Sequence, residues 1–284
     1  MINGEIGHGQ KNRRRVKHMS RYDKSNYVFV ICAYGESPYL EECIYSLLNQ
    51  SIPVGIIIAT STPNKYIETL AAQYHLNVYV NNDSKGIAGD WNFGYQKANG
   101  RIVTIAHQDD IYGPNFAQKN LEKINNAKHP LISFSDYGEI RDGKRVVSNR
   151  LLNIKRIMLF PLRITLLQRV RFIRRRILSF GSPICCPSVT YVKENLPDVI
   201  FESGYKGSLD WQAWERLSKL KGSFIYCNDI LMFHRIHSES ATSVNIAGND
   251  RTKEDYEMFC KFWPKKIAGL LESFYRRGEK SNEV

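Results

Sequence analysis

Short apolar runs alternate with longer amphipathic segments through residues 27–106, and this alternation restricts the chain to few folds. The runs that read as buried strands are 27–33, 55–59, 77–80 and 102–106. The segments between them, 39–49, 65–74 and 86–98, read as helices, because apolar residues recur on one face of the first. This order predicts an α/β fold with a mixed, mostly parallel central sheet of the nucleotide-binding, Rossmann-like type, flanked by helices.

The fourth predicted strand ends in the polar sequence His107-Gln108-Asp109-Asp110. Ligands of open α/β sheets bind just beyond the carboxyl ends of the strands. Two adjacent carboxylates repel each other unless a proton or a cation neutralises them, and a hard divalent ion that also binds a phosphate would do so. A polar turn that caps the next helix is the alternative interpretation, because Asp is a good N-cap residue.

A glycine-rich turn, Gly86 to Gly89, opens the helix that leads into this strand. Glycine lets the backbone approach a ligand closely, and the start of a helix favours a phosphate. The Gly-x-Gly-x-x-Gly fingerprint is absent after the first predicted strand, and the Walker phosphate loop is absent as well. A dinucleotide-binding or P-loop protein is therefore not indicated.

The composition points to an anionic partner and a reducing compartment. The net charge is +12, which suggests nucleic acid, anionic lipid or phosphate-bearing substrates. Six cysteines without a Cys-x-x-Cys pair read as reduced thiols of a cytosolic protein. The N-terminus has no apolar leader, and no run reaches the ~18 apolar residues that a membrane span needs.

The positive charge is concentrated in two segments. Residues 1–25 carry a basic cluster at 11–17 and read as a flexible arm, either a tether or a disordered tail. Residues 150–178 contain no acidic residue, and they place apolar side chains at helical spacing. This segment predicts a basic amphipathic helix on an anionic membrane surface. The alternatives are a solvated helix that packs its apolar stripe on the domain, or a nucleic-acid patch.

The second half predicts further elements with polar ends. A strand at 131–134 is expected to end at Ser135-Asp136-Tyr137, where Asp136 is either a turn residue or a contact of the acceptor. A helix begins near Ser208, and strands are expected at 224–227 and 231–237. Strand alternation places Arg235 and His237 on the same face. Residues 248–284 read as a helical tail that covers the sheet or adds to membrane contact.

The motifs resemble a family 2 glycosyltransferase of the GT-A fold, from about residue 27 to residue 243. The resemblance rests on 31–51, on 86–101, on His107-Gln108-Asp109-Asp110 at the place of the family's Asp-x-Asp motif, on 208–217 and on 231–243. It implies an inverting transfer of a sugar from a nucleotide-diphosphate sugar to a hydroxyl of a glycan or lipid-linked glycan. It also implies Mn²⁺ or Mg²⁺ as the cofactor, and a cytoplasmic enzyme of polysaccharide synthesis, peripheral on the inner face of the cell membrane.

The same resemblance implies a role for individual residues. Asp210 would be the catalytic base, Asp109 and His237 the metal ligands, and Trp211 and Asp136 contacts of the acceptor. The implied donor-binding residues are Ala33, Tyr34, Glu36, Thr60, Gly86, Gly89, Asp90, Asn92, His107, Gln108 and Arg235. The implied domain spans 26–247, with a nucleotide-sugar half at 26–137 and an acceptor and catalytic half at 180–247.

Two departures from the family pattern matter. The second strand ends in Thr60-Ser61-Thr62-Pro63 where the family usually carries an Asp that contacts the base, so uridine is not implied. His107 replaces the first Asp of the metal motif, and it could be a second ligand or a ribose contact. Two other functions stay open at this point: a nucleotidyltransferase, or a non-enzymatic module that binds anionic lipid or nucleic acid.

Overall fold

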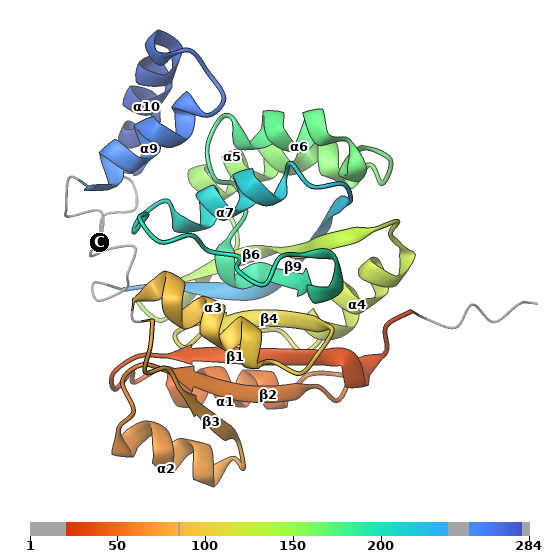
Figure 1. Cartoon of the computed structure of the whole chain (residues 1–284), viewed down its shortest axis with the longest axis vertical. Coiled ribbons are helices and arrows are strands. Elements are labelled where there is room, and N and C mark those ends of the chain that lie inside the picture. The colour runs from red at the N-terminus through yellow and green to blue at the C-terminus, as the bar shows by residue number, and fades with distance from the viewer. Residues whose placement is uncertain (1–20, 85, 238–249, 280–284) are drawn as a thin grey trace, which may run out of the picture.

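The computed structural model describes residues 21–84, 86–237 and 250–279, which form a nine-stranded mixed sheet with helices on both faces (Figure 1). The strands are β1 (Tyr27–Ala33), β2 (Gly55–Thr60), β3 (Asn77–Val80), β4 (Ile102–His107), β5 (Ile111–Tyr112), β6 (Pro130–Arg141), β7 (Lys144–Val146), β8 (Val189–Val192) and β9 (Ser223–Ile236). The helices are α1 (Leu40–Leu48), α2 (Lys65–Gln73), α3 (Ile87–Lys97), α4 (Phe116–Asn126), α5 (Arg150–Leu159), α6 (Arg171–Leu178), α7 (Leu209–Leu217), α9 (Asp250–Cys260) and α10 (Lys265–Glu279).

The strand order is β3-β2-β1-β4-β8-β6-β9-β5, and β7 pairs with β6. Strands β1 to β4 are parallel; β8 is antiparallel to both β4 and β6, and β6 is parallel to β9. Six strands therefore run in one direction, and β5, β7 and β8 oppose them. The predicted mixed, mostly parallel sheet is confirmed.

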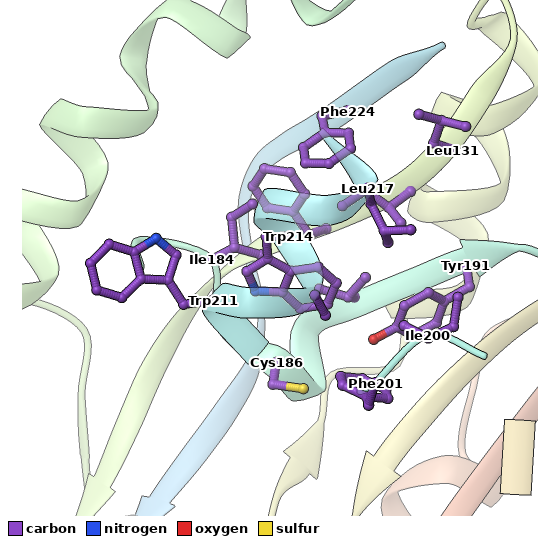
Figure 2. Packing of buried hydrophobic residues seen from close by; sticks show 14 of the residues in the cluster. Leu131, Ile184, Cys186, Tyr191, Ile200, Phe201, Trp211, Trp214, Leu217 and Phe224 are labelled. Carbon is purple, nitrogen blue, oxygen red and sulfur yellow. The ribbon is translucent and has the colours of Figure 1, made fainter. Parts of the chain in front are cut away.

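Two hydrophobic clusters cover the two faces of the sheet. One joins β1 and β2 to α1, α2 and α4. The other joins α3, α6 and α7 to Met258 and Phe259 of α9, and Trp214 lies at its centre (Figure 2). The described part of the helical tail predicted at 248–284 is the hairpin of α9 and α10. Met258, Phe259 and Ala268 belong to the main core, whereas Ile267, Leu270 and Phe274 are exposed.

Two predicted strand ends were wrong. Strand β6 continues through Ser135-Asp136-Tyr137 to Arg141, and its register with β9 shifts at these residues. The polar side chain of Asp136 is tolerated inside the strand because Arg156 pairs with it at 2.7 Å. The two strands expected at 224–227 and 231–237 are a single strand, β9, which includes the same irregularity.

The basic segment 150–178 is two helices, not one continuous helix. Helix α5 ends before Pro161, whose ring removes a backbone donor and disfavours a helix interior. Two 3₁₀ turns, Phe160–Arg163 and Leu167–Arg169, connect it to α6. The predicted apolar stripe is split as a result: Leu162 is buried, whereas Leu166 is 67% exposed.

The residues at the end of the predicted N-terminal arm pack on the domain. Tyr22 is buried, its hydroxyl donates to Glu194 at 2.5 Å, and Arg21 and Arg101 pair with the same carboxylate. The arm therefore cannot extend to residue 25. The basic cluster at 11–17 lies outside the described residues.

Candidate functional site

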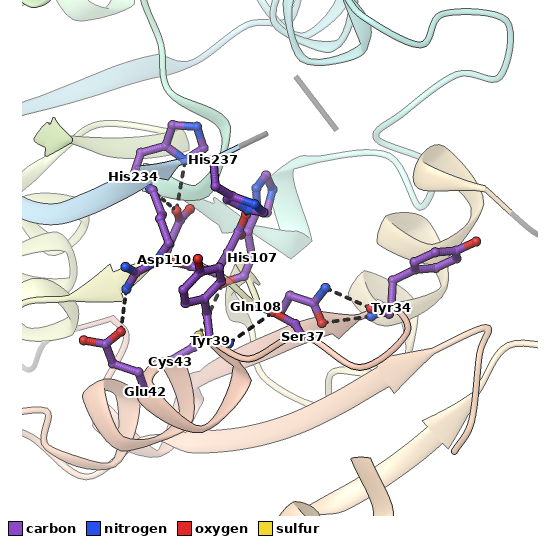
Figure 3. Close-up of polar contacts among 12 residues, drawn as sticks. Tyr34, Ser37, Tyr39, Glu42, Cys43, His107, Gln108, Asp110, His234 and His237 are labelled. Carbon is purple, nitrogen blue, oxygen red and sulfur yellow. Dashed lines mark hydrogen bonds and ion pairs between the residues drawn. The ribbon is translucent and has the colours of Figure 1, made fainter. Parts of the chain in front are cut away.

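The carboxyl ends of β1, β2 and β4 meet at one edge of the sheet, where the register aligns Cys32 with His107 and Ala33 with Thr60. Strand β5 follows Asp110 immediately and pairs with β9, so the end of β9 reaches the same edge. Figure 3 shows His234 of β9, and His237 directly after its end, converging with His107 and Asp110 at the end of β4. The sheet therefore brings together two segments that lie more than 120 residues apart.

Asp110 contacts His234 of β9, and Asp109 contacts His237, the residue that follows β9. The Oδ1 of Asp110, which is fully buried, accepts the backbone N–H of Arg235 at 2.9 Å and lies 2.9 Å from Nδ1 of His234. Burial alone would lower the pKa of His234, but the charge and hydrogen bond of Asp110 raise it to about 9. The Oδ2 of Asp109 lies 3.0 Å from Nε2 of His237. Burial would raise the pKa of Asp109, but this hydrogen bond and the charges of His107 and His234 bring it below the usual value.

His107 completes a group that can hold a cation. Its ring stacks on Trp91 with centroids 4.7 Å apart, and burial lowers its pKa, which favours the neutral, ligating form. Among the described residues, its Nε2 has no hydrogen-bond partner, and neither has Oδ2 of Asp110. Ligand atoms of His107, Asp109 and Asp110 all lie within 4.8 Å of one another. Buried polar atoms are rarely left unpaired, so these atoms fit the coordination of an ion.

Arg235 is held by the protein itself. Its guanidinium pairs with Glu42 of α1, donates to the backbone oxygen of Asp109 at 2.9 Å and lies 4.2 Å from the centre of the Tyr39 ring. Only 9% of the residue is exposed. Arg235 therefore fixes the Asp109 backbone, and its predicted contact with the donor stays a prediction. Glu42 and Tyr39 were missed, because a helix sequence does not show which strand it will meet.

Gln108 fixes the loop after β1. Its side-chain amide makes two 3.0 Å hydrogen bonds with the backbone N–H and oxygen of Tyr34 (Figure 3). Tyr34 is 66% exposed at this edge, and Glu36 is exposed two residues further on. Ala33 is buried, so a donor could reach its backbone alone. Gln108 therefore fixes the backbone of Tyr34, whose side chain is exposed.

Several residues predicted to bind the donor make hydrogen bonds within the protein that connect the strand ends to neighbouring segments. Asp90 accepts a hydrogen bond from Ser61 at 2.8 Å and another from Asn81 at 2.7 Å, and so it ties the ends of β2 and β3 to α3. The buried Thr60 hydroxyl accepts the Thr62 N–H at 3.0 Å. Asn92 bonds the backbone of Ile200 and Phe201. Asn81 was missed by the sequence analysis, although it directly follows a predicted strand.

The two glycines of the predicted turn, Gly86 and Gly89, are each required for a different structural reason. Gly86 has φ +98°, a left-handed conformation that other residues rarely adopt. At Gly89, a Cβ atom would lie 2.0 Å from the backbone oxygen of Ser84. The turn is thus a tight entry to α3.

Asp210 lies in the first turn of α7. Its Oδ1 accepts the Trp211 N–H at 2.6 Å, and the Ser182 hydroxyl lies 3.4 Å from its Oδ2. Burial raises the pKa of Asp210 above the usual value, against these hydrogen bonds and the charges of Arg251 and Lys155. The Asp210 charge in turn raises the pKa of His107, although burial has the larger, opposite effect there. Asp210 is therefore near enough to His107 for its charge to affect the pKa of that imidazole.

The two residues predicted to contact the acceptor, Trp211 and Asp136, are both buried. Trp211 is 1% exposed, donates its indole N–H to the Leu178 oxygen and packs on Phe259. Asp136 is buried in its ion pair with Arg156. Trp211 is a core residue because the side chain after Asp210 on a helix points to a different face, and the acceptor contact predicted for it stays a prediction.

The family model described as "Glycosyl transferase family 2" matches residues 28–198, more than half of the chain. Among curated proteins, an uncharacterized glycosyltransferase of Rickettsia prowazekii (strain Madrid E) is 25% identical over 252 residues, covering 84% of this chain and 71% of that protein. A second one, from Rickettsia typhi (strain ATCC VR-144 / Wilmington), is 24% identical over the same length.

Two solved structures are similar in fold. TarS 1–349 of S. aureus in complex with UDP-GlcNAc has a TM-score of 0.59 at 14% identity, covering 91% of this chain and 73% of that one. The mannosyltransferase PcManGT from Pyrobaculum calidifontis in complex with GDP-Man and Mn²⁺ has a TM-score of 0.57 at 12% identity, covering 88% and 68%. These likenesses confirm the predicted GT-A fold class.

Proposed function

Because the chain belongs to glycosyl transferase family 2 and is a glycosyltransferase, we propose that it moves a sugar, with inversion, from a nucleoside-diphosphate sugar to a hydroxyl of a glycan or lipid-linked glycan. Membership of this family excludes the two alternative functions, a nucleotidyltransferase and a non-enzymatic binding module. The observation that carries the proposal is the group His107, Asp109 and Asp110, whose ligand atoms lie within 4.8 Å of one another at the strand ends, with His237 3.0 Å from Asp109. The nucleotide-sugar complexes of similar structures support it.

The donor would lie over the carboxyl ends of β1, β2 and β4, in the half formed by 26–137. Asp109 and His237, with the unpaired atoms of His107 and Asp110, are the residues that would hold Mn²⁺ or Mg²⁺. When bound, the ion neutralises charge that develops on the diphosphate leaving group. The bonds of Arg235 to Glu42 and to the Asp109 backbone keep this carboxylate oriented. The exposed Tyr34 ring lies where it can contact the nucleotide.

Asp210, in the acceptor half formed by 180–247, serves as the general base. The acceptor hydroxyl oxygen attacks the anomeric carbon, the bond from that carbon to the diphosphate oxygen breaks, and the nucleoside diphosphate leaves with the electron pair. The hydroxyl proton passes to Oδ2 of Asp210, because Oδ1 already accepts the Trp211 N–H. The raised pKa makes this carboxylate a better proton acceptor than an ordinary Asp.

A thermal-shift experiment tests the donor site directly. The protein is melted with UDP, GDP, TDP, CDP or ADP, each with and without Mn²⁺, and Asp109→Asn is compared with Asp229→Asn as a control. Asp229 is half exposed and pairs with Lys119 at 3.3 Å, so its substitution changes a surface carboxylate only. We expect one nucleotide to stabilise wild type and the control in a Mn²⁺-dependent way, and Asp109→Asn to lose this effect. A nucleotide shift that Asp109→Asn retains in full would refute the metal site.

We also propose that residues 150–178 bind an anionic membrane on the cytoplasmic side, where a lipid-linked acceptor would be presented. The structure leaves large apolar side chains of this segment exposed, and they are Ile154, Ile157, Phe160, Ile164, Leu166, Val170 and Phe172. Arg163, Arg169, Arg171 and Arg176 are exposed among them. Among the described residues, no helix has the length and apolarity to cross a bilayer. Apolar and Arg side chains together suit the interface of an anionic leaflet.

Co-sedimentation with vesicles tests this surface. Phosphatidylcholine vesicles with and without phosphatidylserine are compared, using Phe172→Ser and, as the control, Tyr45→Ser on α1. The two aromatic side chains are similarly exposed, at 66% and 61%. We expect binding that requires phosphatidylserine and that Phe172→Ser weakens. Equal binding of both variants would contradict the proposed surface.

A further inference from the structure

The loop that precedes α7 is held by two acidic side chains of α9. Glu254 accepts three backbone N–H groups: its Oε1 binds Lys206 at 2.8 Å, and its Oε2 binds Gly207 at 2.8 Å and Ser208 at 2.9 Å. The Ser208 hydroxyl donates to Asp255 at 2.6 Å. Four hydrogen bonds therefore join three consecutive residues of one loop to two consecutive residues of a helix that lies more than 40 positions later.

These contacts hold the residues that lead into α7, up to its N-cap. Ser208 occupies the N-cap position but makes no capping hydrogen bond with its own side chain, because its hydroxyl is directed to Asp255. The Glu254 carboxylate binds the N–H of Ser208 and of the two residues before it, next to the helix start, where negative charge is favourable. Glu254, Asp255 and Ser208 are 8%, 3% and 2% exposed, so water contributes little and the geometry is restrained.

The attachment of α9 to the domain does not depend on Glu254. Met258 and Phe259 are buried in the main hydrophobic cluster, and Phe259 packs edge-on against Trp211 at a centroid distance of 4.9 Å. Such apolar burial is enough to hold the helix in place. Glu254 therefore has one specific effect, which is to fix the position of residues 206–208. The last of these residues lies two positions before Asp210.

We propose that Glu254 is a positioning residue for sugar transfer: it fixes the first turn of α7 and thereby aims the Asp210 carboxylate at the acceptor hydroxyl. The inference rests on the proposed role of Asp210 as the base. A base that is displaced by about 1 Å can lose roughly 10²-fold in rate, whereas donor binding at the strand ends does not use this loop. Loss of Glu254 therefore acts on kcat and leaves donor affinity unchanged.

The test uses Glu254→Gln in the full chain, which keeps the size of the side chain but turns one of its two acceptor oxygens into a donor that faces backbone N–H groups. The matched control is Glu257→Gln, an exposed Glu of the same helix. Release of nucleoside diphosphate from UDP-glucose, UDP-GlcNAc or GDP-mannose, with water as acceptor, reports kcat and donor KM. Hydrogen exchange at Lys206, Gly207 and Ser208 reports the hydrogen bonds.

We expect Glu254→Gln to lower kcat by about 10- to 100-fold with donor KM changed less than twofold, and to speed exchange at the three amides. Glu257→Gln should match wild type in kcat, in donor KM and in amide exchange. Faster exchange with an unchanged kcat would overturn the positioning role, and an equal loss in donor KM and kcat would show a merely structural one. If Glu254→Gln fails to fold, Ser208→Ala removes one of the four hydrogen bonds and should lower kcat several-fold, again at unchanged KM; an unchanged kcat would then overturn the proposal.

Asp210→Asn separates this failure from failure of the proposed function. If Asp210→Asn abolishes turnover and Glu254→Gln does not change it, the base stands and the positioning role is refuted. If neither variant changes turnover, the assignment of the base itself is wrong, and the positioning role falls with it.

Discussion

Replacing Asp210 by Asn removes the proton acceptor with little change in shape. The Asn side chain can keep its oxygen on the Trp211 N–H, 2.6 Å away in the wild type, and the Ser182 hydroxyl can rotate to accept from the new NH₂ group. Burial disfavours the charged carboxylate, which is why the pKa of Asp210 is raised. The variant relieves that cost, so we expect its melting temperature to equal or exceed that of the wild type.

The expected loss is in turnover. A positioned general base contributes about 10²–10⁴-fold, which corresponds to ~3–5 kcal/mol of transition-state free energy. The raised pKa indicates a strong base, so we expect the upper part of this range. Affinity for the donor nucleotide should stay within about twofold, because the donor residues belong to other strand ends.

The assay follows nucleoside diphosphate release at saturating donor and compares Asp210→Asn with Asp229→Asn at the exposed surface. Nucleotide binding is measured in parallel by thermal shift. A folded Asp210→Asn protein that retains more than a tenth of wild-type kcat would refute Asp210 as the base. A large loss of nucleotide affinity would instead place Asp210 in the donor site.

Three further predictions concern pH and packing. Activity should fall on acidification through a pKa above the ordinary Asp value of 3.8, because Asp210 acts only when deprotonated and burial raises its pKa; this is measured as the acid limb of kcat. Glu194→Gln should lower the free energy of unfolding at pH 7 by about 1 kcal/mol. Although burial would raise the pKa of Glu194, hydrogen bonds from Tyr22 and Arg101 lower it. The contribution of Glu194 to stability is therefore present above pH 4.5 and is lost as the pH falls through its folded-state pKa. Urea unfolding of wild type and variant across pH measures this contribution, and a stability difference that does not depend on pH would contradict the prediction. Gly94→Ala should destabilise by roughly 1–3 kcal/mol, because its Cβ would lie 2.7 Å from Cγ1 of Val30, and an unchanged urea midpoint would contradict this.

The sequence was sufficient for the half of the fold in which local signals agree with tertiary packing. Strands β1 and β4 are mostly apolar runs with side chains buried on both faces, so they can be recognised from the sequence without knowledge of a distant partner. The break after α5 was also readable, because Pro161 stands inside the predicted helix. The extension of β6 was not, because Asp136 looks like a turn residue until Arg156 is known to neutralise it.

The site was predictable to the level of motifs and no further. The pair of Asp109 and His237 was anticipated from the family resemblance, and the two side chains lie 3.0 Å apart. The partners of Arg235 and of Asp90 depend on which elements meet in space, and periodicity contains no such information. Glu254 gave no signal at all, because an acidic residue on a polar helix face is ordinary until its three backbone donors are seen.

The cluster around Trp214 has a consequence for the boundaries of the folding unit. The segment that matches the family ends at residue 198, yet Trp211, Trp214, Met258, Phe259 and Ala268 complete the core on that face of the sheet. A piece trimmed to the matching segment would expose the apolar surface that all five side chains cover, and a piece trimmed to 26–247 would expose the part that Met258, Phe259 and Ala268 cover. The segment that the family model matches is therefore smaller than the part that must fold together, and domain swaps in this protein should exchange the whole span from residue 21 to residue 279.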